Sequence, residues 1–263
     1  MELGSKLIKE LRALLSFLTI LPVGATPLND AARGFYLVSI VGAVEGLTIG
    51  LTIYSLLHII KDRCILAALY IAIHLIITRG LHLDGFADYC DAIGSLKHGA
   101  EALEVMKDPR KGTFAITLLF TNMILTYVAV SNLISTLSST TILILLTLIY
   151  VLSAEAMYIL SALGIPEPYA GLAKEFVENA KKRANIVKNI VITMGIIFLI
   201  TTASPQLKLL TTFIVLATVI TCAVIAYDVA KRLGFVNGDV LGFCYETVRV
   251  VNLVLVNVFS QYL

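Results

Sequence analysis

Long runs of apolar residues alternate with short polar segments along this chain of 263 residues. Seven runs approach or reach the roughly 17 to 25 residues that a helix needs to cross the hydrocarbon core of a bilayer. They lie at 35–60, 64–79, 113–134, 140–163, 186–203, 208–228 and 240–263. The second run is short, and Glu246 and Arg249 interrupt the last one. The pattern predicts an all-α, polytopic membrane bundle of about seven transmembrane helices.

The apolar stretch 5–21 differs from these seven runs, because Lys6, Lys9 and Arg12 give it positive charge. Such a stretch is typical of a helix that lies in the membrane interface or re-enters it. No internal repeat, low-complexity segment or Pro/Gly/Ser linker divides the chain. We therefore expect one integral-membrane domain over residues 1–263.

Composition agrees with a membrane location. Hydrophobic residues make up 58% of the chain and charged residues 14%, whereas a soluble domain carries about 25% charged residues. The four cysteines have no paired spacing, so neither a disulfide framework nor a zinc site is expected. Membrane lipid is the expected surrounding, and no nucleic-acid partner is expected.

The basic residues sort to one side of the membrane if the seven runs cross it in turn. Sixteen of the 20 lysines and arginines fall on that side. They are Lys6, Lys9, Arg12, Arg33, Arg79, Lys97, Lys107, Arg110, Lys111, Lys174, Lys181, Lys182, Arg183, Lys188, Lys231 and Arg232. By the positive-inside rule this side is cytoplasmic. The segments 79–112, 164–188 and 229–239 would then meet on the cytoplasmic face of the cell membrane, where one site can draw on all three.

The segment 79–112 is the longest polar interruption of the apolar pattern, and it carries three aspartates at helical spacing. Asp84, Asp88 and Asp91 stand at i, i+4 and i+7, so a helix would place their carboxylates on one face. Neighbouring anions repel one another unless a cation lies between them. Mg²⁺ is commonly held by a few carboxylates, waters and substrate phosphates. The spacing therefore predicts a magnesium site and phosphate chemistry.

A second polar helix is expected over residues 100–108, AEALEVMKD. Its acids Glu101, Glu104 and Asp108 are again spaced to share one face. Four basic residues flank them, Lys97, Lys107, Arg110 and Lys111. Two acidic helices with basic neighbours can hold one or two Mg²⁺ ions and neutralise a polyphosphate. The alternative, solvated amphipathic helices on the membrane surface, explains the second helix equally well.

A third polar element, GFVNGDVLGF at 234–243, sets Asp239 beside Gly238 at the start of the last apolar run. Glycines let backbone amides approach a phosphate closely, and a neighbouring carboxylate can bind a metal, a hydroxyl or a guanine edge. The ordinary interpretation of such a pair is a turn or a helix cap.

These blocks resemble those of one known family. RGLHLDGFADYCDAIG and LEVMKDPRKGTFA are similar to the blocks GGLHLDGLADTADGL and LEIMKDSRIGTFG of the cobalamin synthases, the adenosylcobinamide-GDP ribazoletransferases. GFVNGDVLGF resembles their GGVTGDVLGA, and the amino-terminal FLTILPV resembles their FLTRLPV. The blocks occur in the same order, so the resemblance covers almost the whole chain.

The resemblance implies a transferase that joins adenosylcobinamide-GDP to α-ribazole or its 5′-phosphate, requires Mg²⁺ and releases GMP, in the last assembly step of cobalamin biosynthesis. In such an enzyme Asp84, Asp88 and Asp91 would hold Mg²⁺, and one of them or Asp108 would help to deprotonate the attacking hydroxyl. His82 would bind phosphate, act as a base or hold the loop. The expected substrate-binding residues are Lys107, Arg110, Glu104, Gly238 and Asp239.

Two other function classes fit parts of the pattern. One is another membrane Mg²⁺-dependent phosphoalcohol or prenyl transferase, although residues 89–94 lack the arginine of a phosphoalcohol transferase block. The other is a secondary transporter with Glu45 and Glu155 as ion sites, but the chain shows no internal symmetry. Both glutamates can instead pair with hydroxyls and amides between helices. His58 and His74 are expected to be packing residues.

Small residues in GAVEG, at 42–46, permit two helices to pack closely. Such a contact is compatible with a homo-oligomer or with association with other cobalamin-assembly enzymes. It is equally compatible with packing inside one chain.

Overall fold

The computed structural model describes residues 2–24 and 27–260, and most of these residues are helical. The elements are α1 (Glu2–Leu18), α2 (Leu28–Arg33), η1 (Phe35–Leu37), α3 (Val38–Leu56), α4 (Arg63–Thr78), α5 (Leu81–Gly94), α6 (Gly99–Lys107), α7 (Thr113–Thr136), α8 (Ser139–Leu163), α9 (Leu172–Ala180), α10 (Arg183–Ala203), η2 (Pro205–Leu207), α11 (Lys208–Arg232) and α12 (Gly238–Phe259). Among these residues the one β-type pairing is an isolated bridge between Pro166 and Val236. The prediction of an all-α membrane fold is confirmed.

Five stretches of the described chain are long and apolar enough to cross a membrane. They are Phe35–Leu56, Thr113–Thr136, Ser139–Leu163, Arg183–Ala203 and Pro205–Arg232. The helices α4 and α5 form a bent pair with an angle of 96° between them, which adds a sixth span if the pair crosses as one. All seven predicted runs fold as helices, but the count of seven spans is not confirmed, because α4 is short and α12 is not among the five.

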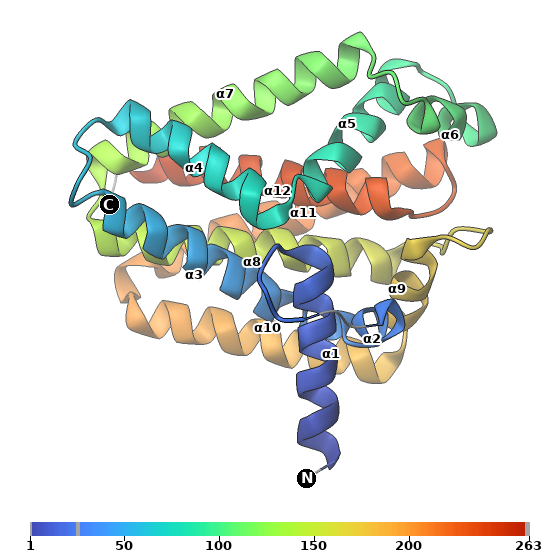
Figure 1. The fold of residues 1–263 in the computed structure, drawn as a ribbon, viewed down its shortest axis with the longest axis horizontal. Coiled ribbons are helices and arrows are strands. Elements are labelled where there is room, and N and C mark those ends of the chain that lie inside the picture. Colours follow the sequence, from blue (N-terminus) through green and yellow to red (C-terminus); the bar gives the residue numbers. More distant parts are fainter. Residues whose placement is uncertain (1, 25–26, 261–263) are drawn as a thin grey trace.

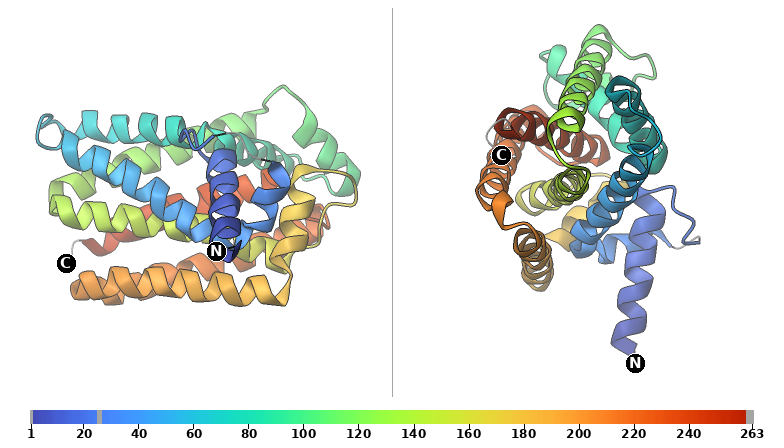
Figure 2. Two further views of the ribbon diagram at one scale, coloured as in Figure 1. Left: turned by 60° about the horizontal axis from the view of Figure 1, so that its bottom comes forward. Right: turned by 90° about the vertical axis from the view of Figure 1, so that its left-hand side faces the viewer.

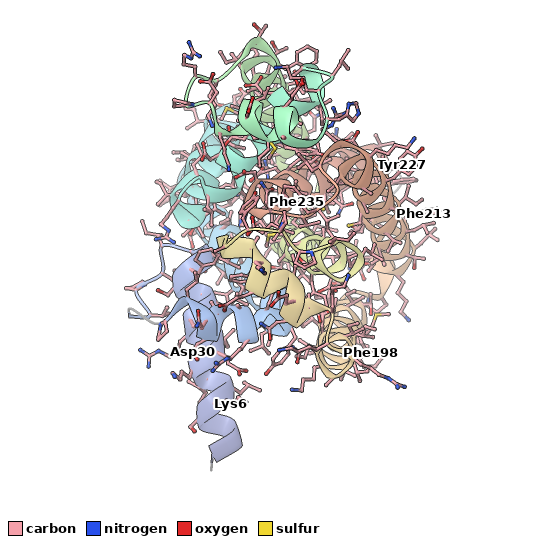
Figure 3. The ribbon with its side chains drawn as sticks, turned by 90° about the vertical axis from the view of Figure 1, so that its right-hand side faces the viewer. Lys6, Asp30, Phe198, Phe213, Tyr227 and Phe235 are labelled. Atoms are coloured by element: carbon pink, nitrogen blue, oxygen red, sulfur yellow. The ribbon has the colours of Figure 1, made fainter. Side chains whose placement is uncertain are left out.

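The long helices lie side by side, with α8 in the middle of the bundle (Figures 1 and 2). Within its most apolar window α8 is 83% buried, whereas α10 is 11% buried. Figure 3 shows Phe198 of α10 and Phe213 and Tyr227 of α11 on the outside of the bundle, and all three are exposed. An apolar outer surface of this kind suits contact with lipid.

One end of the bundle, which we call the basic end, is formed by α2, α6, α9 and the loops 108–112 and 233–237. Figure 3 looks onto this end and shows Phe235 near its centre, with Lys6 and Asp30 lower on the same face. The helix α1 runs across the direction of the long helices near this end (Figure 1), as an interfacial helix would. Lys9 of α1 binds Asp30 of α2, with Nζ and Oδ2 2.9 Å apart.

Close packing of α3 on α8 depends on three glycines spaced four residues apart. A Cβ on Gly42 would lie 2.5 Å from the carbonyl oxygen of Tyr150, and a Cβ on Gly46 would lie 2.6 Å from the Cα of Thr147. Gly50 extends the contact to Leu143. The GAVEG motif therefore packs against α8 of the same chain.

A network of polar side chains lies inside the bundle around an ion pair on α12. Arg249 Nη2 donates to Glu246 Oε2 at 2.7 Å, and the other Glu246 oxygen lies 3.0 Å from His74 Nε2 on α4. Three further side chains complete the network, Tyr150, Thr126 and Asn122. The expectation that His74 only packs was wrong, because both of its ring nitrogens have hydrogen-bond partners. Buried charges of this kind need such partners.

Two more buried glutamates bridge helices, as their positions suggested. Glu155 of α8 accepts hydrogen bonds from Asn189 Nδ2 at 2.9 Å and Thr193 Oγ1 at 2.8 Å, both on α10. Glu45 of α3 accepts from the Tyr245 hydroxyl of α12 at 2.7 Å. Of the alternatives open for these glutamates, the contacts show pairing with hydroxyls and an amide, which joins α8 to α10 and α3 to α12.

Candidate functional site

The helices α5 and α12 cross very closely, because glycines line their contact. A Cβ on Gly85 of α5 would lie 2.7 Å from the Cα of Asp239, and a Cβ on Gly242 of α12 would lie 2.7 Å from the carbonyl oxygen of His82. Only residues without a side chain let two backbones approach so far. The crossing brings the aspartates of α5 beside the first turn of α12.

Asp84 and Asp88 hold the same cation, Lys111. The Lys111 Nζ lies 3.1 Å from Asp84 Oδ1 and forms a still closer ion pair with Asp88 Oδ1. The Asp84 side chain is 70% exposed, whereas that of Asp88 is only 13% exposed. The two carboxylates share the face that their i, i+4 spacing predicts, and the point between them suits a positive charge.

Asp91 caps another helix. Its Oδ2 accepts from the Gly112 amide at 2.5 Å, and its Oδ1 accepts from the Ala115 amide at 2.8 Å. These amides open α7, whose N-cap residue provides no side-chain acceptor, so Asp91 satisfies groups that the helix leaves unpaired. No three His, Cys, Asp or Glu side chains in the described chain are grouped to hold a metal ion. A site of three aspartates stays a prediction, and the donors that fit Mg²⁺ best are Asp84 and Asp88.

The end of α6 presents an acid and a base that are bound to each other. Asp108 accepts from the Arg110 guanidinium, with Oδ2 and Nη2 2.9 Å apart. These hydrogen bonds lower the pKa of Asp108 to about 2. Both residues line a surface hollow of about 300 Å³ that Asp91 also borders. Glu104 is exposed on α6. The cation that borders the hollow is Arg110.

Lys107 links α6 to the loop between α8 and α9. Its Nζ lies 5.0 Å from the centre of the Tyr169 ring, and that ring packs edge-on against Phe235 at 5.7 Å between centroids. Three polar segments that are far apart in sequence, those holding Lys107, Tyr169 and Phe235, therefore meet at the basic end. The expectation that the three segments meet is confirmed, and one site that draws on all three stays a prediction.

Asp239 begins α12 in a partly buried position. Asn237 caps the helix by accepting from the Val240 amide at 3.0 Å, and its Nδ2 donates to Asp239 Oδ2 at 3.2 Å. Burial and the negative charges of Asp88 and Asp84 raise the pKa of Asp239 to about 6. Gly238 and Asp239 therefore begin α12, and Asp239 forms an acidic cluster with Asp84 and Asp88.

A mainly apolar pocket of about 170 Å³ opens beside this cluster. Asp84, Gly238 and Asp239 border it, together with His82. The His82 ring is buried and stacks on Tyr245, with 4.0 Å between ring centroids. Its Nε2 has no hydrogen-bond partner. His82 therefore lies inside the protein, in the first turn of α5.

Sequence reasoning missed a second charged contact behind the aspartate helix. Arg232 at the end of α11 binds Asp228, with Nη2 and Oδ1 2.9 Å apart, and its Nη1 donates to the Ala92 carbonyl oxygen at 3.2 Å. Asp228 in turn accepts from the Tyr89 hydroxyl of α5 at 2.6 Å. The i, i+4 spacing of Asp228 and Arg232 was the available signal. These contacts join α5 to the end of α11.

Comparison with known proteins gives one consistent family. The family model described as cobalamin-5-phosphate synthase matches residues 10–257. An adenosylcobinamide-GDP ribazoletransferase from Clostridium kluyveri is 24% identical over 95% of this chain and 96% of its own length. Those from Caldanaerobacter subterraneus and Lachnoclostridium phytofermentans are 28% and 31% identical, over 92% and 78% of this chain and 96% and 75% of theirs. No solved structure is significantly similar. The chain belongs to the cobalamin-5-phosphate synthase family.

Proposed function

We propose that this protein joins adenosylcobinamide-GDP to α-ribazole, or to its 5′-phosphate, and releases GMP. One observation carries the proposal beyond family membership. Asp84 and Asp88 converge on a single cation position beside Asp239, at the closest approach of α5 and α12. Transfer at a diphosphate needs such a position, because the reaction develops negative charge on phosphate oxygens that a fixed cation stabilises.

The chemistry is a substitution at phosphorus. The ribazole 3′-hydroxyl attacks the phosphorus nearer the cobinamide, its oxygen forms the new P–O bond, and the bond to the GMP oxygen breaks. The hydroxyl proton passes to a carboxylate, and Asp239 is suited to accept it, because it is partly buried and borders the same pocket as Asp84. Mg²⁺, held by Asp84 and Asp88, would neutralise the diphosphate.

The basic residues of the site suit the phosphate groups. The Arg110 side chain is 88% exposed and borders the hollow next to Asp91, so its free guanidinium edge can bind two phosphate oxygens. Lys111 would release Asp84 and Asp88 when Mg²⁺ binds and could then contact the same phosphates. The positive-inside rule supports a cytoplasmic position for the basic end, where nucleotide substrates are found.

The test uses purified protein in detergent with both substrates and Mg²⁺. GMP should form in step with the joined product, and removal of divalent metal by chelation should stop its formation. Asp84→Asn and Asp88→Asn should each lower the rate at least about 100-fold while leaving expression and thermal unfolding close to wild type. Glu178→Gln, on an exposed position of α9, serves as the matched control. The proposal fails if no GMP is released with any divalent metal, or if both aspartate variants keep near-normal rates.

A further inference from the structure

A wide groove, of about 640 Å³, lies between α1 and α10. Arg33 of α2, Tyr36 of η1 and Asn179 of α9 also border it. We call it the α1–α10 groove. Within the described chain it shares no lining residue with the pocket beside the aspartates. Figure 3 shows this region, with Lys6 of α1 and Phe198 of α10 on either side of the lower part of the basic end.

The lining of the groove carries more positive than negative charge. Its basic side chains are Lys6, Arg33, Lys182 and Lys188, and its acidic side chain is Glu10. Glu10 is buried and accepts a hydrogen bond from the Tyr36 hydroxyl at 2.9 Å, so a neutral donor already holds this carboxylate. The Arg33 side chain is 63% exposed, and its Nη1 lies 3.8 Å from Asp30 Oδ1, which is too far for a hydrogen bond. The groove therefore offers cations to an anionic ligand.

An aromatic ring holds Lys188 in the groove. The Lys188 Nζ lies 4.8 Å from the centre of the Tyr36 ring, and the Asn189 side chain donates to the Tyr36 carbonyl oxygen at 3.4 Å. An ammonium over a ring face is attracted by the ring while its three N–H donors stay available. Lys188 can therefore keep this contact while it donates to an oxygen of a bound phosphate.

An apolar stripe leads out of the groove along α10. Val187 and Val191 line the groove, and Met194 and Phe198 continue along the helix at the spacing that keeps side chains on one face. All four side chains are more than half exposed. At 1.5 Å per residue, the stripe from Val187 to Phe198 is about 16 Å long. Because α10 is long and apolar enough to cross a membrane, this exposed stripe suits contact with a lipid chain.

We propose that the α1–α10 groove binds an anionic phospholipid from the leaflet that surrounds the basic end. The phosphate lies among Lys6, Arg33 and Lys188, and one acyl chain follows the stripe from Val187 to Phe198. A phospholipid has its parts in this order, since its charged headgroup is joined directly to apolar chains. Basic clusters beside membrane helices attract anionic lipids, and each lysine or arginine near the surface adds to the attraction. Lipid binding here does not depend on the proposed function.

Two other occupants fit the groove less well. A soluble phosphate or nucleotide would use the cations, but it has no apolar part to cover Leu7 and Val191. A second copy of this chain, placed groove to groove in a symmetric dimer, would bring the same basic side chains together. Like charges at such short distances repel one another. An anionic amphiphile satisfies both the cations and the apolar stripe.

A bound lipid would also affect the helix that carries part of the aspartate pocket. Phe17 at the end of α1 borders that pocket and stacks on Phe176 of α9, with 5.3 Å between ring centroids. A lipid that contacts both α1 and α10 would hold α1 against the bundle. We expect anionic lipid to raise the temperature of unfolding, because a ligand that binds only the folded state stabilises that state.

The test measures lipid binding to the purified protein in detergent by native mass spectrometry. One phosphatidylglycerol should bind at least about tenfold more tightly than phosphatidylcholine with the same acyl chains, and it should raise the temperature of unfolding. Loss of one basic residue near a membrane surface lowers lipid affinity about fivefold. The groove variant, Arg33→Gln with Lys188→Gln, should therefore bind phosphatidylglycerol about 25-fold more weakly and phosphatidylcholine almost as before.

The matched control is Arg183→Gln with Lys231→Gln. It removes the same two charges from the predicted cytoplasmic side, but neither residue lines the groove. Lys231 also lies over an aromatic ring, 4.4 Å from the centre of Tyr227. The control should keep the wild-type affinity for phosphatidylglycerol. If the groove variant unfolds in detergent, Lys6→Gln at an exposed position of α1 should still weaken binding about fivefold.

The proposal is overturned if both lipids bind equally tightly, or if the control weakens phosphatidylglycerol binding as much as the groove variant does. It is also overturned if inorganic phosphate displaces phosphatidylglycerol at equal concentration, because the groove would then be an ion site. A dimer that the groove variant converts to monomer would overturn it as well, since a second copy would be the occupant. Absence of GMP release with lipid binding intact would count against the proposed function alone.

Discussion

The close crossing of α5 and α12 predicts that a single methyl group will separate the two halves of the site. In Gly85→Ala the new Cβ would lie 2.7 Å from the Cα of Asp239 and 2.9 Å from its carbonyl oxygen. Both are backbone atoms, which cannot rotate away as a side chain could. Carbon atoms pack at about 3.5 to 4.0 Å, so the helices must move apart by about 1 Å at this point.

The magnitude follows from two opposing effects. Overpacking of a tight contact costs about 1 to 3 kcal/mol of stability, and replacing a helical glycine with alanine returns up to about 1 kcal/mol. The free energy of unfolding should therefore fall by about 0 to 3 kcal/mol. Activity should change much more, because a displacement of about 1 Å between reacting groups costs about 100-fold in rate.

The assay is the rate of GMP release, measured beside thermal unfolding in detergent. Gly195→Ala is the matched control, because an added Cβ on Gly195 of α10 meets no atom within 4 Å. It should keep full activity and unfold at the wild-type temperature or slightly above it. A Gly85→Ala protein with wild-type kcat would show that the spacing of α5 and α12 does not set the geometry of the site, and an equal loss in Gly195→Ala would refute the reasoning as well.

Three further outcomes follow from the contacts. Asp91→Ala should destabilise the protein by about 1 to 2 kcal/mol in thermal unfolding, because two amides at the start of α7 lose their acceptor. Arg249→Met should cost about 3 to 5 kcal/mol, because it leaves the buried Glu246 carboxylate without its guanidinium partner, and adding Glu246→Gln should recover part of this loss. Folding raises the pKa of Asp239 from 3.8 to about 6, so the folded state binds this proton more tightly; in metal-free protein, stability should fall as pH rises from about 4 to about 6, and Asp239→Asn should lose this part of the pH dependence.

The sequence was sufficient to predict the helices and the shared face of Asp84 and Asp88, because both depend on local periodicity. It did not reveal that Asp91 caps α7, since that contact depends on how the loop 108–112 folds back onto α5. Lys111 was one basic residue among several in the pattern, and only the three-dimensional packing sets it between the two aspartates. Likewise, no local pattern indicates that the ring nitrogens of His74 contact Tyr150 of α8 and Glu246 of α12.

The break between α4 and α5 shows a different limit. Arg79 and Gly80 at the junction both have positive φ, 53° and 64°. A glycine at this position indicates a turn. The same backbone conformation is uncommon in an arginine, so the residue type of Arg79 does not predict it. The Arg79 side chain donates to the Phe17 carbonyl oxygen at 2.6 Å, so a contact with α1 accompanies the turn. The count of seven spans stays unconfirmed, because α4 is short and α12 is not among the five long apolar stretches.

The buried Glu246–Arg249 pair also bears on how the protein is made. Its partners His74, Thr126 and Tyr150 belong to α4, α7 and α8, all of which leave the ribosome before α12. Charged side chains enter a bilayer at low cost only where ionic or hydrogen-bonding partners are already in place. The helix α12 would therefore be integrated after α4, α7 and α8, into a polar slot that these helices have assembled, and a chain cut after α11 would leave that slot empty in the membrane.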